Sequence, residues 1–273
     1  MRTLSDAIYG VAVGDALGVP FEFKTRGTFK AQIMTGNGTH RQPAGTWSDD
    51  TSLTLATCYS IKRKGGIDLD DIMACFRAWL FNNEFTAGGK VFDCGGTTNK
   101  AINQGHGERG IHSNGNGSLM RIIPLAFIEG VTDRQIRDVS ALTHGHIISA
   151  TACVIYVRLA QKLLEGKTFL QALEETKIKG KDFVFLKNIL DYQEKDIKSG
   201  GYVLDTLAAA LWCLSNTSSY KEAVLKAVNL GADTDTTAAV TGGLAGIIYG
   251  KENIPAVWLK ILKNRNCIED CLF

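Results

Sequence analysis

The most informative stretch of this chain of 273 residues is the segment Gly-Ala-Asp-Thr-Asp-Thr-Thr at residues 231–237. Its two carboxylates stand two positions apart, each is followed by a hydroxyl, and no Lys or Arg lies beside them. Such oxygens are the ligands that hard divalent cations such as Mg²⁺, Mn²⁺ and Ca²⁺ prefer. A long run of small and apolar residues with helical spacing follows. The segment therefore predicts a cation site at the start of a core helix.

A second acidic cluster, Trp-Ser-Asp-Asp-Thr at residues 47–51, precedes another apolar stretch. Either cluster alone also fits a capped helix start, because carboxylates and hydroxyls there accept hydrogen bonds from free N–H groups. One acid would suffice for a cap, whereas two acid pairs without basic neighbours favour metal binding. An EF-hand is excluded, because its required glycine and glutamate would fall on Ala238 and Leu244. We expect the two clusters to meet in space around metal ions.

The composition is that of an ordinary soluble protein, and its net charge of +2 gives no overall reason to expect nucleic acid or an anionic membrane as a partner. The seven cysteines are scattered without a Cys-x-x-Cys pair, which favours reduced thiols in the cytoplasm. The first residues lack the apolar core of a signal peptide. Residues 147–164 come closest to a membrane span, but Arg158 and Lys162 interrupt them. We expect a cytoplasmic protein without membrane contact.

Helical patterns extend along the chain, and no regular alternation of strands and helices occurs. The expected fold is all-α, a compact multi-helix arrangement with about ten or more helices. The length allows one large domain or two close lobes, and the lack of a clear linker favours a single domain over residues 1–273. Helices are predicted at 4–17, 51–64, 68–82, 147–164, 183–192, 203–214, 223–230, 236–249 and 256–262, with capping boxes beginning at Thr132, Thr168 and Ser219. Long loops are predicted at 24–46, 83–96 and 105–117.

Several other residues are candidates for binding. Gly-Asn-Gly-Ser at residues 115–118 precedes a helix and offers free N–H groups to a phosphate, although no Walker lysine accompanies it. Arg121 fits either added charge at that loop or an ordinary ion pair. His144 and His146 are badly spaced for one metal ion, so a hydrogen-bonding histidine is expected. Tyr202 fits either a base-stacking or a core position, and Asp15 is expected to be a structural hydrogen-bonding residue.

Taken together, these motifs resemble the ADP-ribosylglycohydrolase family. The resemblance rests on seven short motifs, which follow the order of that family and span nearly the whole chain. They are Gly-Asp-Ala-Leu-Gly (14–18) with Pro-Phe-Glu (20–22), Trp-Ser-Asp-Asp-Thr (47–51), Phe-Asp-Cys-Gly-Gly-Thr-Thr (92–98), Gly-Asn-Gly-Ser-Leu-Met-Arg (115–121), Thr-His (143–144), Gly-Tyr-Val (201–203) and Gly-Ala-Asp-Thr-Asp-Thr (231–236).

The resemblance implies an all-α fold and a site with two divalent metal ions, Mg²⁺ or Mn²⁺. It also implies hydrolysis of the glycosidic bond between ADP-ribose and an acceptor, with ADP-ribosyl-arginine on protein as the foremost candidate substrate. The implied metal ligands are Ser48, Asp49, Asp50, Asp233, Asp235 and Thr236, with serine where threonine is commoner at 48. The implied catalytic acids are Asp49, Asp50, Asp93 and Glu22, and either Asp50 or Asp93 could be the general base. The implied substrate-binding residues are Gly115, Asn116, Gly117, Ser118, Met120, Arg121, His144 and Tyr202.

Other function classes remain open at this point. A non-catalytic ADP-ribose binder would be expected to have lost metal ligands, and all six are present here. A metal-dependent phosphatase or nucleotide hydrolase would use similar ions. The Asp-x-Asp-x-Thr string also resembles the nucleophile motif of haloacid-dehalogenase-type phosphatases, but that motif follows a strand, and residues 223–230 look helical. The expected partners are an ADP-ribosylated protein or a small ADP-ribosyl compound, with nucleic acid only as a modified acceptor. We expect a monomer.

Overall fold

A computed structural model describes residues 2–178 and 180–273, and these residues form helices joined by loops, with no strand among them. The all-α expectation is confirmed. The α-helices are α1 (Leu4–Gly18), α2 (Asp49–Lys64), α3 (Leu69–Asn82), α4 (Gly96–Gln104), α5 (Asp133–Ala141), α6 (Ile147–Leu164), α7 (Phe169–Glu175), α8 (Val203–Ser215), α9 (Tyr220–Asn229), α10 (Thr234–Tyr249), α11 (Ala256–Ile261) and α12 (Arg265–Cys271). Short 3₁₀ helices are η1 (Val19–Phe21), η2 (Asn116–Ser118), η3 (Ile123–Phe127), η4 (Lys181–Asp191), η5 (Glu194–Asp196) and η6 (Lys251–Asn253).

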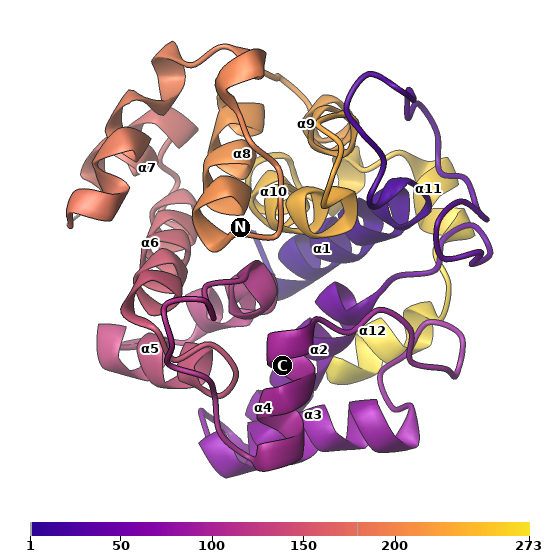
Figure 1. The fold of residues 1–273 in the computed structure, drawn as a ribbon, viewed down its shortest axis with the longest axis vertical. Coiled ribbons are helices and arrows are strands. Elements are labelled where there is room, and N and C mark those ends of the chain that lie inside the picture. Colours follow the sequence, from indigo (N-terminus) through magenta and orange to yellow (C-terminus); the bar gives the residue numbers. More distant parts are fainter. Residues whose placement is uncertain (1, 179) are drawn as a thin grey trace.

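Helices α1 and α10 lie antiparallel and side by side near the middle of the molecule (Figure 1). Small residues repeat every four positions on both facing surfaces, so the two backbones touch directly. A Cβ atom added to Gly14 would lie 2.2 Å from the carbonyl oxygen of Ala238, and one added to Gly10 would lie 2.2 Å from that of Gly242. At the end of α1, Gly18 packs in the same way against Asp235. The pair therefore brings the end of α1 to the acidic start of α10.

Asp15 of α1 holds the start of α2. Its carboxylate accepts hydrogen bonds from the backbone N–H of Ser48 (2.9 Å) and of Thr51 (3.0 Å), and from the hydroxyl of Thr51 (2.6 Å). These bonds satisfy N–H groups that a helix start leaves free. Burial raises the pKa of Asp15 to about 6, against the opposing effect of the hydrogen bonds from Thr51 and Ser48. The expected structural role of Asp15 is confirmed.

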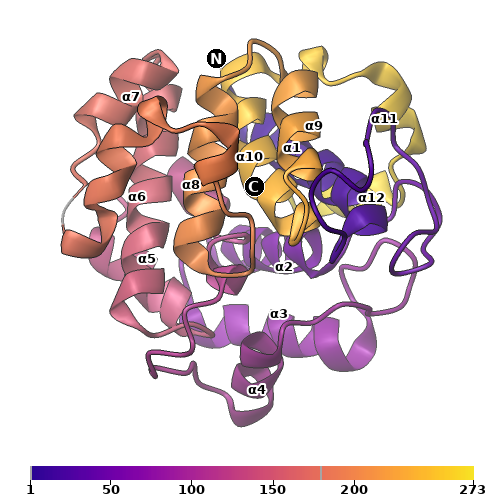
Figure 2. The same cartoon turned by 45° about the horizontal axis from the view of Figure 1, so that its top comes forward.

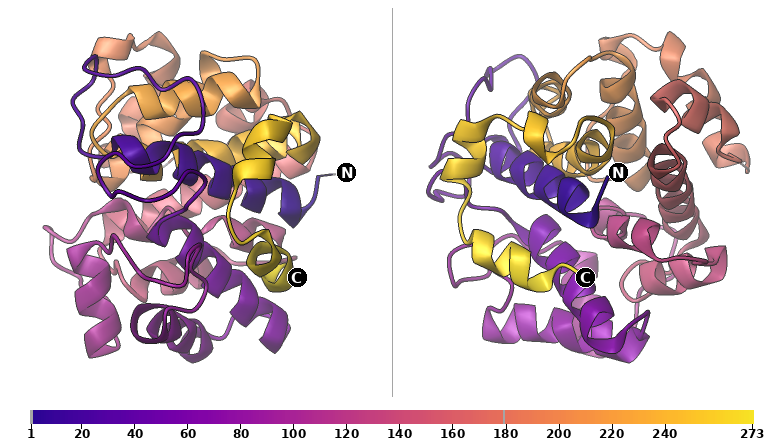
Figure 3. Two further views of the ribbon diagram at one scale, coloured as in Figure 1. Left: turned by 90° about the vertical axis from the view of Figure 1, so that its right-hand side faces the viewer. Right: turned by 180° about the vertical axis from the view of Figure 1, so that it is seen from behind.

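The remaining helices surround this centre. Helices α8 and α9 pack on α10, while α3 and α4 form a lower layer below α2 (Figure 2). Seen from behind, α12 lies along α2 (Figure 3). Helix α6 is long and apolar enough to cross a membrane by composition alone, but 67% of it is buried inside the fold, as expected of a core helix.

The α-helix predicted at residues 183–192 is wrong in type, because η4 is a 3₁₀ helix. Its buried residues are Phe183, Leu186 and Ile189, which follow each other every three positions. A 3₁₀ helix has three residues per turn, so this spacing places all three on one face. The capping boxes at Thr132 and Thr168 are present. Ser219 caps α9 as expected, but Glu222 accepts its hydrogen bonds from Ser218 instead of completing the box.

The contact between α1 and α10 predicts a steep penalty for any side chain at its centre. Gly14→Ala should lower the free energy of unfolding by about 1–3 kcal/mol, because the new methyl group meets backbone atoms that cannot move aside. The control is Gly66→Ala, where an added Cβ meets nothing within 4 Å and the expected change stays within about 0.5 kcal/mol. Urea unfolding measures both variants. Equal stabilities would show that this contact is not tight.

Candidate metal centre and cleft

The two acidic clusters meet where the starts of α2 and α10 converge. Asp50 Oδ2 accepts hydrogen bonds from the hydroxyls of Ser48 (3.0 Å) and Thr236 (3.3 Å), one from each cluster. Carboxylate oxygens of Asp15, Asp50 and Asp235 lie within 4.8 Å of one another. Residues almost 190 positions apart in the chain thus share one small volume, as the sequence predicted.

The buried carboxylates leave several oxygens without hydrogen bonds. Among the described residues, Asp50 Oδ1, Asp233 Oδ1 and Asp235 Oδ2 are buried and have no hydrogen-bond partner. A buried charged oxygen without a partner costs several kcal/mol, and buried acids are therefore paired or coordinate metals. The three oxygens are of the kind that hard divalent cations prefer. The residues present therefore fit a divalent cation at this place.

Burial and mutual repulsion act on the ionisation of these acids. Burial, together with the charges of neighbouring carboxylates, raises the pKa values of Asp49, Asp50 and Asp235 well above their usual range. The pKa of Asp233 is also raised by burial, although Asn116 opposes the rise by donating a hydrogen bond. A bound cation removes this penalty, because it replaces the protons that the acids would otherwise retain.

A cleft of about 240 Å³ opens next to the acidic centre. Asp49, Asp233 and Thr236 lie at its inner side, with Glu22 and Asp93 also on its wall. The other lining residues are Gly95, Gly96, Thr97, Thr98, Gly115, Asn116, Gly117, Met120, His144 and Gly201. No Lys or Arg is among these described lining residues, so the cleft carries four carboxylates without a fixed cation.

His40 is a site residue that the sequence analysis missed. Its Nε2 forms a hydrogen bond with Oε2 of Glu22 and lies 3.8 Å from a carboxylate oxygen of Asp93. Atoms of Glu22, His40, Asp93 and Asp235 gather within 4.8 Å of one another. Residues 24–46 showed no period or motif, so the sole signal was an ionisable side chain within a long loop.

Asn116 is tied to the acidic centre as well as lining the cleft. Its Nδ2 donates hydrogen bonds to Asp233 Oδ2 (2.8 Å) and to the hydroxyl of Thr206 (2.9 Å). Next to it, Gly117 leaves room for His144, because an added Cβ would lie 2.8 Å from Cε1 of that ring. The glycine loop at residues 115–118 therefore approaches both the acids and the histidine.

Three of the candidate substrate-binding residues lie away from the wall of the cleft. Arg121 is fully buried behind it and stacks on Phe76 at 4.6 Å, so the structure does not bring its charge to the glycine loop. Ser118 is also buried and hydrogen-bonds to Ser140. Tyr202 is 40% exposed and contacts the loop through a backbone bridge to Gly115. The sequence could not reveal that Arg121 points into the core.

Arg121 instead determines which nitrogen of His144 carries the proton. Burial lowers the pKa of Arg121 to about 10, so it stays charged at neutral pH and can only donate hydrogen bonds. It donates to the Thr143 hydroxyl (2.8 Å), which lies 2.9 Å from Nδ1 of His144. Burial, aided by the charge of Arg121, lowers the pKa of His144 to about 3, so its ring is neutral. Because the Thr143 oxygen already accepts a hydrogen bond from Arg121, we assign its own proton to the hydrogen bond with Nδ1, which leaves the ring proton on Nε2 near Gly115 in the cleft.

This chain of hydrogen bonds predicts a measurable change on losing the Thr143 hydroxyl. In the wild-type protein, ¹⁵N NMR should show His144 protonated on Nε2 alone. Thr143→Val keeps the shape of the side chain but removes the donor, so the spectrum should shift towards a mixture of both tautomers. Thr217→Val, at a half-buried threonine whose hydroxyl binds a backbone carbonyl on the far side of α8, is the control. A wild-type ring protonated on Nδ1 would contradict the assignment.

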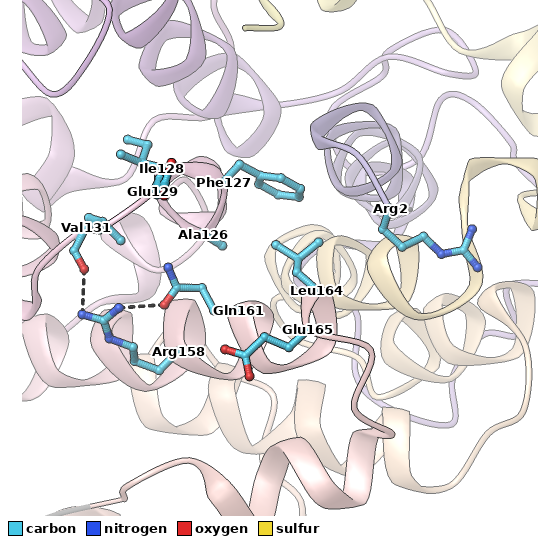
Figure 4. A pocket seen from close by; sticks show the side chains of 11 residues that line it. Arg2, Ala126, Phe127, Ile128, Glu129, Val131, Arg158, Gln161, Leu164 and Glu165 are labelled. Atoms are coloured by element: carbon cyan, nitrogen blue, oxygen red, sulfur yellow. Dashed lines mark hydrogen bonds between the residues drawn. The ribbon is translucent and has the colours of Figure 1, made fainter.

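A larger cavity of about 540 Å³ lies between η3 and α6, but it lacks such chemistry (Figure 4). Arg158, which lines it, donates hydrogen bonds to the carbonyl of Val131 (2.8 Å) and to Gln161 (2.7 Å). None of the partnerless carboxylate oxygens of the described residues lies in its wall. The smaller cleft is therefore the candidate functional site.

The fold and site define an all-α protein with a buried acidic centre at a cleft. A sequence profile of the ADP-ribosylglycohydrolase family matches residues 3–272, and the chain belongs to this family. It is 34% identical to the ADP-ribosylarginine hydrolase Tri1 of Serratia proteamaculans, over 97% of this chain and 76% of that protein. It is 32% identical to the ADP-ribosyl-[dinitrogen reductase] glycohydrolase of Rhodospirillum rubrum, over 94% of this chain and 88% of that protein.

A solved structure supports the same assignment. The structure of an ADP-ribosylglycohydrolase-related protein complex superposes with a TM-score of 0.83 at 33% sequence identity. The match covers 97% of this chain and 93% of the other. The similarity thus extends over all the elements that build the acidic centre.

The repulsion among the acids predicts how the stability of the metal-free protein depends on pH. Burial and the charge of Asp93 raise the pKa of Glu22 to about 10, against an ordinary value of 4.5. The stabilisation due to this protonated group is complete below pH 4.5 and is lost as pH rises towards 10. Between pH 5 and 8 the metal-free protein should therefore lose up to about 1.4 kcal/mol per pH unit through Glu22.

Glu22→Gln, which is always neutral, should reduce this slope, whereas Glu84→Gln, at an exposed acid, should not. Urea unfolding in EDTA at pH 5, 6, 7 and 8 measures all three proteins. Parallel curves for wild type and Glu22→Gln would show that Glu22 ionises normally.

Proposed function

We propose that this protein is a divalent-metal-dependent hydrolase that releases ADP-ribose from ADP-ribosylated arginine on proteins. The observation that carries the proposal is the set of buried carboxylate oxygens on Asp50, Asp233 and Asp235 that have no partner among the described residues, with Asp233 also lining the cleft. Relatives named as an ADP-ribosylarginine hydrolase and an ADP-ribosyl-[dinitrogen reductase] glycohydrolase support the reaction and the acceptor.

The proposed metal site holds two ions, Mg²⁺ or Mn²⁺. Its ligands are Ser48, Asp49, Asp50, Asp233, Asp235 and Thr236. Two groups of potential ligand atoms share Asp235, which supports two adjacent cation positions. When bound, such ions supply Lewis acidity and lower the pKa of a water molecule towards neutrality.

The remaining cleft residues bind and orient the substrate in this proposal. A cavity of about 240 Å³ is smaller than the usual 300–1,000 Å³ of ligand sites, so it suits the terminal ribose rather than all of ADP-ribose. In this proposal the backbone N–H groups of Gly115 and Gly117 bind the diphosphate, because that of Asn116 already donates to the carbonyl of Gly201, and Nε2–H of His144 donates a hydrogen bond into the cleft. Tyr202, exposed beside Gly115, is placed to stack on the adenine.

Asp93 is the better placed of the two candidate general bases. It lines the cleft and its side chain is 22% exposed, whereas Asp50 is 1% exposed and lies behind the cleft wall. Asp93 therefore takes the proton from the attacking water in this proposal, with Glu22 beside it as a hydrogen-bonding acid. The carboxylate of Asp49, ionised when a cation is bound, stabilises positive charge that develops on the ribose as the bond to the acceptor opens. We propose further that residues 1–273 act as one cytoplasmic, monomeric domain.

The test begins with metal-stripped protein and ADP-ribosylated arginine and serine peptides, with and without Mg²⁺ or Mn²⁺. Mass spectrometry should find free ADP-ribose only when metal is present, and the arginine peptide should be the one consumed. Asp49→Ala and Asp235→Ala should each lower turnover by at least about 10³-fold while the protein stays folded. Asp70→Asn, at an exposed acid on α3, should retain full activity.

Each other outcome has a definite meaning. Release of AMP or phosphate would move the protein to a metal-dependent phosphohydrolase. Release of ADP-ribose at the same rate in EDTA, or full activity of Asp235→Ala, would contradict the metal site. Consumption of the serine peptide alone would replace the proposed acceptor.

A further inference from the structure

Two acids of the cleft each have an aromatic neighbour in the chain. Phe23 follows Glu22, and Phe92 precedes Asp93. The ring of His40 neighbours both phenylalanines, with its centre 6.0 Å from that of Phe23 and 5.4 Å from that of Phe92. We name Phe23, His40 and Phe92 the aromatic rim. The rim reaches Glu22 and Asp93 through His40, which contacts both acids.

Phe23 is held at the surface by its backbone and not by burial. Its side chain is 70% exposed, and its φ of 63° lies in the left-handed region, which is unfavourable for a bulky residue. Two hydrogen bonds impose this conformation, from Phe23 N–H to the carbonyl of Ala232 (2.7 Å) and from Ala232 N–H to that of Lys24 (2.8 Å). Ala232 directly precedes Asp233, so the acidic segment itself fixes the position of Phe23.

The chemistry of this place suits a planar cation. Guanidinium groups bind both to carboxylates and to aromatic faces. Four carboxylates line the cleft without a Lys or Arg among the described lining residues, and the nearby Lys24 ammonium lies over Phe21, 5.1 Å from the ring centre. A neutral acceptor such as a serine hydroxyl would gain little from such surroundings, because it carries no charge to interact with the rings or the acids.

We propose that the aromatic rim, with Glu22 and Asp93, is an acceptor subsite that binds the guanidinium group of ADP-ribosylated arginine. The inference rests on the proposed function and adds to it the residues that select the acceptor. Phe23 and Phe92 contact the acceptor side chain outside the cleft, while ADP-ribose occupies the cleft itself. The two phenylalanines therefore determine acceptor specificity without affecting the affinity for ADP-ribose.

The experiment compares Phe23→Leu, Phe92→Leu and the double variant with wild-type protein in Mg²⁺. Leucine retains an apolar side chain but lacks a ring face. The control is Phe81→Leu, at a 57% exposed phenylalanine on α3. We measure kcat/KM for the ADP-ribosyl-arginine and ADP-ribosyl-serine peptides, together with Kd for ADP-ribose and for both peptides.

Each single variant should lower kcat/KM for the arginine peptide about 2- to 5-fold, the effect of one exposed cation–π contact, and the double variant should lower it further. The Kd values for the serine peptide and for ADP-ribose should stay within about twofold of wild type. Equal losses on both peptides, or no loss on the arginine peptide, would overturn the subsite.

The binding data separate this inference from the proposed function. If the wild-type protein releases ADP-ribose from neither peptide, the proposed function fails. The subsite then stands if Phe23→Leu and Phe92→Leu still weaken binding of the arginine peptide and not of ADP-ribose. It falls if both ligands are bound equally by all variants.

Discussion

The direct backbone contact between α1 and α10 is the constraint on which the rest of the structure depends. Glycines at four-residue spacing let the helices approach so closely that a single methyl group at Gly14 has no room. The antiparallel pairing places Gly18 against Asp235, and Asp15 in the same part of α1 holds the start of α2. One helix thus sets the relative positions of both acidic clusters, which lie almost 190 residues apart.

The buried acids of the metal centre destabilise the folded protein unless a cation is bound to them. Desolvation and mutual repulsion both raise their pKa values, and three of their oxygens have no hydrogen-bond partner among the described residues. The buried acids therefore lower the free energy of unfolding at the place where the proposed metal site requires negative charge. Such a local cost is expected of functional sites. Behind the cleft, burial together with the charge of Arg121 keeps His144 neutral, and we assign its remaining proton to the nitrogen that faces the cleft.

The sequence predicted what local patterns determine. The acid pairs at residues 49–50 and 233–235, free of basic neighbours, predicted both the site and the meeting of distant segments. It could not predict contacts that arise only when loops fold over the cleft, as for His40 and Phe23, because residues 24–46 lack any period. Arg121 lies one turn beyond the glycine loop, a position from which its side chain could face the loop or point away from it. Its packing on Phe76 places it in the core. The buried residues of the 3₁₀ helix η4 recur every three positions, whereas those of an α-helix recur every three or four. In a short apolar run the sequence does not distinguish these two patterns.

We propose that the buried carboxylates bind divalent cations, and a crystal structure with Mn²⁺ provides the sharpest test of this proposal. Anomalous scattering from manganese locates the ions independently of any substrate or reaction. We expect anomalous-difference peaks within about 2.0–2.2 Å of Asp50 Oδ1, Asp233 Oδ1 and Asp235 Oδ2. Peaks elsewhere, or none while these oxygens accept hydrogen bonds from ordered water, would contradict it.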